Sequence, residues 1–108
     1  MFERFIIRLK THLKEWDIKY RIHATKRMFE RDIEEIDIFE TLERGIIIED
    51  YGEDYPFPSV LINRDIKTRR PIQMVVGIDR ESKCLYIITV YEPDSEKWKN
   101  NFRKRVKR

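Results

Sequence analysis

The spacing of apolar residues divides the chain into a helical first part and a strand-rich second part. Residues 2–16 carry apolar side chains at steps of three and four, which predicts one amphipathic helix. Residues 18–22 break this spacing and predict a connection or a short extended piece. The apolar stripe of the first helix consists of Phe2, Phe5, Ile6, Leu9, Leu13 and Trp16.

Two further helices are predicted before the first strand. One runs from His23 to Arg31, and the next begins at Asp32 as its N-cap. Glu35 lies three residues after Asp32 and would complete a capping box, while Gly45 would end the helix in a left-handed conformation. The inner face of this helix is expected to hold Ile36, Phe39 and Leu42, widened by Ile33 and Ile38.

The second part of the chain has the period of strands. Strands are predicted at 46–51, 59–66, 71–79 and 84–91, and a loop rich in proline and acids at 52–58. Connections this short join antiparallel neighbours, so we expect a four-stranded antiparallel meander.

The two faces of this meander differ in polarity. Alternate residues of a strand point to opposite faces of the sheet. One set, or parity, is apolar and would be covered by the helices, whereas the other set is mixed and its face would stay partly open. A last helix is predicted within 94–105, docked by Trp98 and Phe102. The apolar parity consists of Val60, Ile62, Ile72, Met74, Val76, Ile78, Tyr86, Ile88 and Val90.

Length and composition indicate one α+β domain over residues 1–108, long enough to hold a core without disulfides or metals. Charged residues make up 40% of the chain, a bias typical of heat-adapted proteins and equally of AT-rich genomes. The lone Cys84 cannot form an internal disulfide, and charges interrupt residues 1–16, which excludes an apolar leader or membrane span there. A cytoplasmic location is the expectation.

The net charge of +3 is unevenly distributed. Residues 97–108 contain seven cations and no acid, leaving 16 cations against 20 acids in the rest of the chain. A dense basic tail attracts polyanions, and Arg103 and Lys104 are therefore candidate RNA contacts. The alternative is a solvated terminus without a partner.

The best candidate for chemistry is a stripe formed by His23, Arg27 and Arg31 on one side of a helix. Metal-free RNA cleavage needs a base for the 2′-hydroxyl, an acid for the leaving oxygen and cations for the phosphorane charge. His23 would be the base, and Arg27 and Arg31 would hold phosphate oxygens. The alternative is that His23 caps the helix while the arginines pair with Glu30, Glu34 or Glu35.

Other candidates lie at the ends of the predicted strands. Tyr91 would be the assisting acid, with Thr89 beside it on the open face; the alternative is a tyrosine packed on a loop. Arg69 and Arg70 form a basic turn that would contact RNA or simply be solvated. Cysteine and histidine spacing indicates no metal site, no phosphate loop or dinucleotide fingerprint occurs, and no cofactor is expected.

Four segments together resemble the family of unknown function numbered 4258, over roughly residues 22–98. The segments are HATKRMFERDIEEIDIFETLERG, GIIIEDYGEDYPFPSVLI, RRPIQMVVGID and IITVYEPDSEKW. This family is grouped with the RelE-like toxins and the barnase–EndoU–colicin–RelE ribonucleases. The resemblance implies a RelE-like fold and a small ribonuclease-type toxin that a zinc-finger antitoxin neutralises.

The family motifs fall on His23, Arg27, Arg31, Thr89 and Tyr91, among others. One departure matters: many relatives have Arg-Pro-Leu-His where this chain reads RPIQ, ending at Gln73, and an amide cannot act as a base. The stripe at His23 and the resemblance together lead us to expect a metal-independent endoribonuclease toxin that acts on RNA. The alternative is a non-catalytic RNA- or protein-binding module of the same fold, and a homodimer is one expected form.

Overall fold

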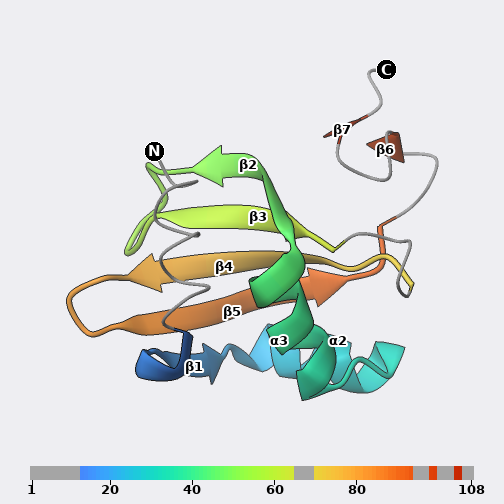
Figure 1. The fold of residues 1–108 in the computed structure, drawn as a ribbon, viewed down its shortest axis with the longest axis horizontal. Coiled ribbons are helices and arrows are strands. Elements are labelled where there is room, and N and C mark those ends of the chain that lie inside the picture. The colour runs from blue at the N-terminus through green and yellow to red at the C-terminus, as the bar shows by residue number, and fades with distance from the viewer. Residues whose placement is uncertain (1–12, 65–69, 94–97, 100–103, 106–108) are drawn as a thin grey trace.

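The computed structural model describes residues 13–64, 70–93, 98–99 and 104–105 (Figure 1). Its first part holds a 3₁₀ turn, a short strand and two helices, and strands make up the rest. The elements are η1 (Leu13–Glu15), β1 (Asp17–Tyr20), α2 (Ile22–Arg31), α3 (Glu35–Arg44), β2 (Ile46–Tyr51), β3 (Ser59–Asn63), β4 (Gln73–Asp79), β5 (Cys84–Tyr91), β6 (Trp98–Lys99) and β7 (Lys104–Arg105).

The α+β class is confirmed, but the sheet has five strands in the order β1-β5-β4-β3-β2. Strands β2 to β5 form the expected antiparallel meander. The residues at 18–22, expected as a connection or a short extended piece, supply most of the fifth strand, β1. This strand pairs in parallel with β5 from Asp17↔Cys84 to Tyr20↔Ile87. Periodicity could not reveal this pairing, because four residues carry too little pattern and their partner lies more than sixty residues away along the chain.

A β-bulge in β5 explains why the predicted parity of that strand is wrong at its centre. Val75 pairs with Thr89, but the next residue, Val76, pairs with Ile87, so Ile88 has no opposite residue. The extra residue exchanges the faces of the strand. Leu85 and Ile87 therefore enter the core, whereas Ile88 is 36% exposed.

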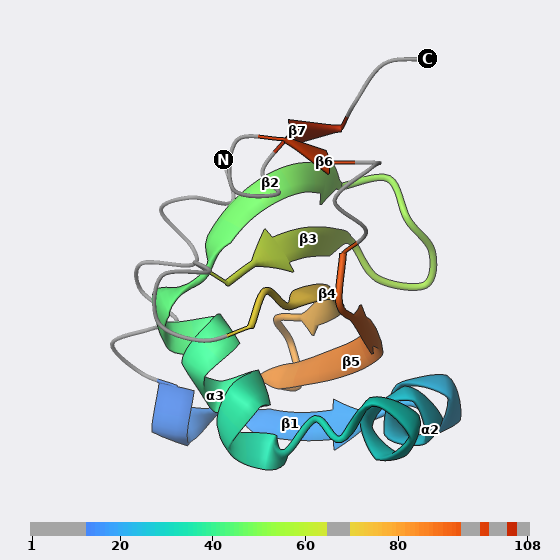
Figure 2. The ribbon, with the colours of Figure 1, turned by 90° about the vertical axis from the view of Figure 1, so that its right-hand side faces the viewer.

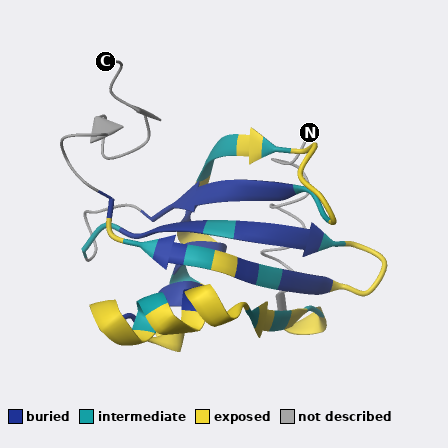
Figure 3. Ribbon diagram, turned by 180° about the vertical axis from the view of Figure 1, so that it is seen from behind, coloured by how far each residue is buried: buried dark blue, intermediate teal, exposed yellow. Residues whose placement is uncertain are grey.

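The two helices occupy different positions relative to the sheet. Helix α3 covers one face, and α2 continues the direction of β1 along the β5 edge (Figures 1 and 2). We call the face opposite α3 the outer face; no helix lies over it in Figure 3. The core between α3 and the sheet contains Ile38, Leu42, Val60, Ile62, Ile72, Met74, Val76, Ile78, Leu85, Ile87 and Val90.

The boundary between the helices differs from the prediction. Asp32 does not cap α3; it ends α2 in a left-handed conformation with φ 54°. The N-cap of α3 is Glu34, whose backbone N–H donates to the Asp37 carboxylate at 2.9 Å in a capping box. The box was therefore predicted two residues too early.

Two details of α3 also differ from the sequence prediction. Ile36 and Phe39 are 55% and 39% exposed, so their predicted place on the inner face is wrong. The predicted Ile33, Ile38 and Leu42 are buried, and Asp37 and Thr41 of α3 are buried with them. Gly45 is not left-handed, with φ −70°. It is needed for space, since a Cβ atom there would lie 2.4 Å from the Ile62 side chain and from the Thr41 carbonyl oxygen.

The N- and C-terminal predictions are only partly covered by the described residues. Of the helix expected at 2–16, residues 13–15 form the η1 turn and residues 1–12 lie outside the described part. The helix expected at 94–105 is wrong where it is described, because β6 and β7 pair as an antiparallel ribbon. Within the described residues, no helix is long and apolar enough to cross a membrane.

Candidate nucleic-acid interface

Helix α2 forms where the chain leaves the parallel strand β1. The Arg21 N–H still bonds to the Ile87 carbonyl at 3.0 Å, and the helix begins at the next residue. Only Ala24 is fully buried, with Met28 half-buried one turn later against the core. The remaining surface of the helix is available for contacts outside the domain.

The predicted stripe lies on the flank of this helix. His23 and Arg31 are exposed and Arg27 is half-buried. In the part of the chain that the structure describes, neither arginine forms an ion pair with an acid, and the N-cap residue Arg21 makes no side-chain cap. The alternative in which these cations pair with neighbouring glutamates is therefore not what the structure contains.

The second predicted group lies at the end of β5. Thr89 and Tyr91 are half-buried on the outer face, paired in register with Val75 and Gln73. Arg70 connects this end to α2: its Nη1 donates to the Arg31 carbonyl and to Glu92 Oε1, each at 2.8 Å. Arg31 and Tyr91 are thus brought to the same end of the molecule.

Arg70 itself is occupied by protein acceptors, since its Nη2 also donates to the Asp32 carbonyl. Its observed role is to fasten the C-terminal end of α2 to the strands. Of the other predicted RNA contacts, Arg69 and Arg103 lie outside the described residues. Lys104 lies in β7, where only the backbone is described.

Sequence analysis missed an aromatic stack at the start of α2. The rings of Phe57 and Tyr86 stack with centroids 5.3 Å apart and an interplanar angle of 5°. The Arg21 guanidinium lies 4.7 Å from the centroid of Tyr86. A hydrogen bond involving Cys84, together with burial, raises the pKa of Tyr86, so this phenol is neutral at physiological pH. Recognising residues 17–20 as a strand beside β5 would have brought Arg21 and Tyr86 together.

A buried ion pair beneath α3 was missed as well. Arg64 is 1% exposed, and its Nη1 contacts Asp37 Oδ1 at 2.8 Å and Glu40 Oε1 at 3.4 Å. Its Nη2 donates to the Arg70 carbonyl at 2.7 Å. Burial opposes ionisation of Asp37, but the Arg64 guanidinium and the Glu34 N–H outweigh it and lower the pKa of Asp37.

Gln73, at the position where many relatives have histidine, is completely buried. Its Nε2 donates to Asn63 Oδ1 at 3.2 Å on the neighbouring strand. A side chain held there faces its neighbours in the sheet and not a substrate. The proposed chemistry therefore cannot rely on this position.

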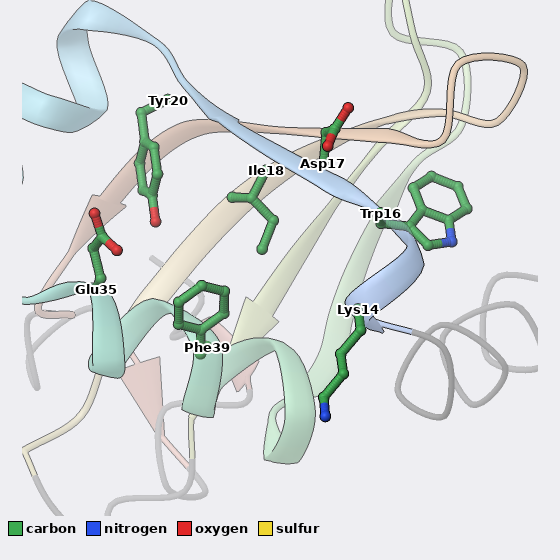
Figure 4. A pocket seen from close by; sticks show the side chains of 7 residues that line it. All are labelled: Lys14, Trp16, Asp17, Ile18, Tyr20, Glu35 and Phe39. Atoms are coloured by element: carbon green, nitrogen blue, oxygen red, sulfur yellow. The ribbon is translucent and has the colours of Figure 1, made fainter.

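A pocket of about 470 Å³ lies between β1 and α3 (Figure 4). The Tyr20 hydroxyl is shielded from solvent there and has no hydrogen-bond partner among the described residues. Burial, and then the Glu35 carboxylate, raises the pKa of Tyr20. None of the predicted site residues lines this pocket, whose walls are Lys14, Trp16, Asp17, Ile18, Tyr20, Glu35 and Phe39.

Among the described residues, no group of three or more histidine, cysteine or acidic side chains is placed to hold a metal ion. No curated protein and no solved structure matches the chain. Comparison with known families matches residues 20–92, more than half of the 108 residues, to the Domain of unknown function DUF4258. The chain therefore belongs to the DUF4258 family.

Proposed function

We propose that this protein is the toxin half of a toxin–antitoxin pair, a RelE-like, metal-independent endoribonuclease whose partner is a zinc-finger-type antitoxin. The observation that carries the proposal is the exposed imidazole of His23 on a helix flank whose two arginines, Arg27 and Arg31, are not paired with acids among the described residues. Two helices followed by an antiparallel run of strands support the RelE-like grouping as an analogy of fold.

In the proposed reaction, His23 takes the proton of a ribose 2′-hydroxyl. The 2′-oxygen then attacks phosphorus, and the bond to the 5′-oxygen breaks as that oxygen takes up a proton from solvent water. The products are a 2′,3′-cyclic phosphate and a 5′-hydroxyl. Arg27, one turn from His23, would stabilise the charge of the phosphorane.

The stack of Arg21, Tyr86 and Phe57 supports RNA as the ligand. Single-stranded RNA is held through aromatic rings and arginine planes that contact its unstacked bases. These rings lie on the outer face beside the first turn of α2. A strand crossing this end of the helix would place a base near the stack and a phosphate near Arg27.

A second candidate function, a non-catalytic RNA-binding module, has its own support. His23 lies near the start of α2 and Arg31 at its end, about 12 Å along the helix axis. Tyr91 is at the Arg31 end, so it is poorly placed to act as the acid on a phosphate held at His23. Gln73 supplies no substitute base.

The test uses purified protein, labelled single-stranded RNA and EDTA. We expect cleavage to cyclic-phosphate products, lost in His23→Gln but not in Glu43→Gln, a matched change on the exposed surface of α3. Binding by His23→Gln should persist and weaken with salt. If the unaltered chain binds the RNA without cleaving it, the protein is the non-catalytic RNA-binding module. If it does not bind the RNA at low salt, both proposed functions are wrong.

The antitoxin part of the proposal has a separate test. Expression of the chain alone should stop growth, and expression of His23→Gln should not. Co-expression with a zinc-finger protein encoded beside it should restore growth through a complex that co-purifies. Normal growth during expression of the unaltered chain would contradict the toxin role. RNA binding would then be judged separately by the cleavage and binding assay.

A further inference from the structure

Helix α2 presents an apolar and cationic stripe to solvent. Ile22, Lys26 and Phe29 are spaced by four and three residues and therefore share one side of the helix. Ile22 is 88% and Phe29 90% exposed, unusual values for large apolar side chains on a helix that packs against a core. We call these three residues the helix patch.

A second exposed segment has the opposite charge. The stretch 49–55, at the end of β2 and in the loop that follows, contains four acids and no cation. Glu49 and Asp54 accept hydrogen bonds from Tyr51 and Ser59, whereas Asp50 and Glu53 are exposed and form no ion pair among the described residues. Tyr55 is 94% exposed beside them. We call Asp50, Glu53 and Tyr55 the acidic patch.

The two patches complement each other in charge and in apolar content. The helix α2 carries Lys26, Arg27 and Arg31 against Glu30 alone. Each patch also exposes apolar surface, so contact between them would remove Ile22 and Phe29 of one patch and the ring of Tyr55 of the other from water. One copy of the chain therefore carries two exposed surfaces of opposite charge, each with apolar side chains in contact with water.

The position of the patches suits a two-fold arrangement. Figures 2 and 3 show α2 beside the β1–β5 end of the sheet and the β2–β3 loop at the other end of the strand order, both displaced away from α3. Ala24 of α2 still packs into the core that α3 covers, so the helix patch on its other side faces outward. In a two-fold pair the contact between a helix patch and an acidic patch would occur twice, because residue i of one copy contacts residue j of the other and the reverse. The part of the outer face formed by β5, where Ile88 is 36% exposed, would lie between the copies.

We infer that the chain forms a two-fold homodimer in which the helix patch of each copy contacts the acidic patch of the other. This inference does not rest on the proposed RNA chemistry, since it concerns only the assembly of the protein with itself. Dimer formation would also cover α2, so RNA and a second copy would compete for the same helix.

The test is analytical ultracentrifugation of the full chain over a wide concentration range and at two salt concentrations. We expect a concentration-dependent dimer that weakens with salt. Phe29→Ser should weaken it about a hundredfold, because two apolar contacts are lost per dimer. The control is Ile36→Ser, on the exposed side of α3, which should leave association unchanged while circular dichroism shows that both variants are folded.

Charge reversal makes the test specific to the proposed pairing. Lys26→Glu and Glu53→Lys should each weaken self-association about tenfold, since like charges then meet twice. Mixing the two variants should restore association, because both contacts become attractive in the mixed pair. A monomer at every concentration would overturn the inference. So would a dimer that is indifferent to Phe29→Ser, or to the charge reversals and their mixture.

Discussion

Helices α2 and α3 contain ten residues each but stand in opposite relation to the core. Helix α3 buries Asp37, Ile38, Thr41 and Leu42 and is fixed by an ion pair to Arg64, whereas α2 fully buries only Ala24. The first therefore contributes mainly to stability, and the second leaves cations, an imidazole and apolar side chains facing solvent. Packing within the described residues therefore does not explain why α2 exposes these side chains.

The largest expected difference is in the free energy of unfolding, between a variant of an arginine beneath α3 and a variant of an arginine on α2. Arg64→Ala leaves Asp37 buried without its partner, so the free energy of unfolding should fall by about 3–5 kcal/mol. Arg27→Ala should change it by no more than about 0.5 kcal/mol, since Arg27 has no partner acid among the described residues. Urea unfolding followed by circular dichroism measures both, and equal losses would contradict the contrast between the helices.

A matched pair of isoleucines tests the same contrast in apolar contacts. Ile38 is completely buried on α3, and Ile38→Ala should cost about 2–5 kcal/mol through lost burial and a residual cavity. Ile22, 88% exposed on α2, should tolerate the same change within about 0.5 kcal/mol. These unfolding measurements should be made at a protein concentration below that at which the inferred dimer would form.

Asp37 on α3 should make the stability of the protein depend on pH. The folded pKa of Asp37 is lowered. Its contribution is therefore fully present above the unfolded value of about 4 and is lost as pH falls through the folded pKa. Asp37→Asn should destabilise the protein by about 1–3 kcal/mol at neutral pH and by less in acid.

Unfolding titrations of the unaltered chain and of Asp37→Asn from pH 7 to strongly acidic solution would show this difference directly. Glu30→Gln, an exposed change on α2, is the control and should alter the free energy of unfolding by no more than about 0.5 kcal/mol at neutral pH. If Asp37→Asn were equally destabilising at every pH, the loss would come from packing and not from the charge of the carboxylate.

Much of the fold follows from local patterns. The limits of the helix predicted at 23–31 and of the strands at 46–51 and 84–91 agree with the structure because their periodicity is clear. The bulge at Ile88 and the strand β1 could not be predicted in this way. Each depends on which residues pair across the sheet, and that information is not contained in the spacing of apolar residues along one segment.

The candidate site was predictable only as a set of residue types. The pattern placed His23, Arg27 and Arg31 on one side of a helix, and all three lie on α2, with His23 and Arg31 exposed and Arg27 half-buried. It could not show that Arg70 is tied to the end of α2, nor that Arg21 lies over Tyr86. Both arrangements join segments that are far apart in sequence.

The central claim is that α2 and the neighbouring β5 edge contact RNA while α3 serves stability. Titration of the ¹⁵N-labelled protein with a short single-stranded RNA, followed by amide chemical shifts, tests it most directly. The account predicts shifts for residues 21–31 and around Tyr86, which weaken with added salt, and unchanged amides along the buried side of α3. Shifts centred on α3, or none on α2 at low salt, would contradict it.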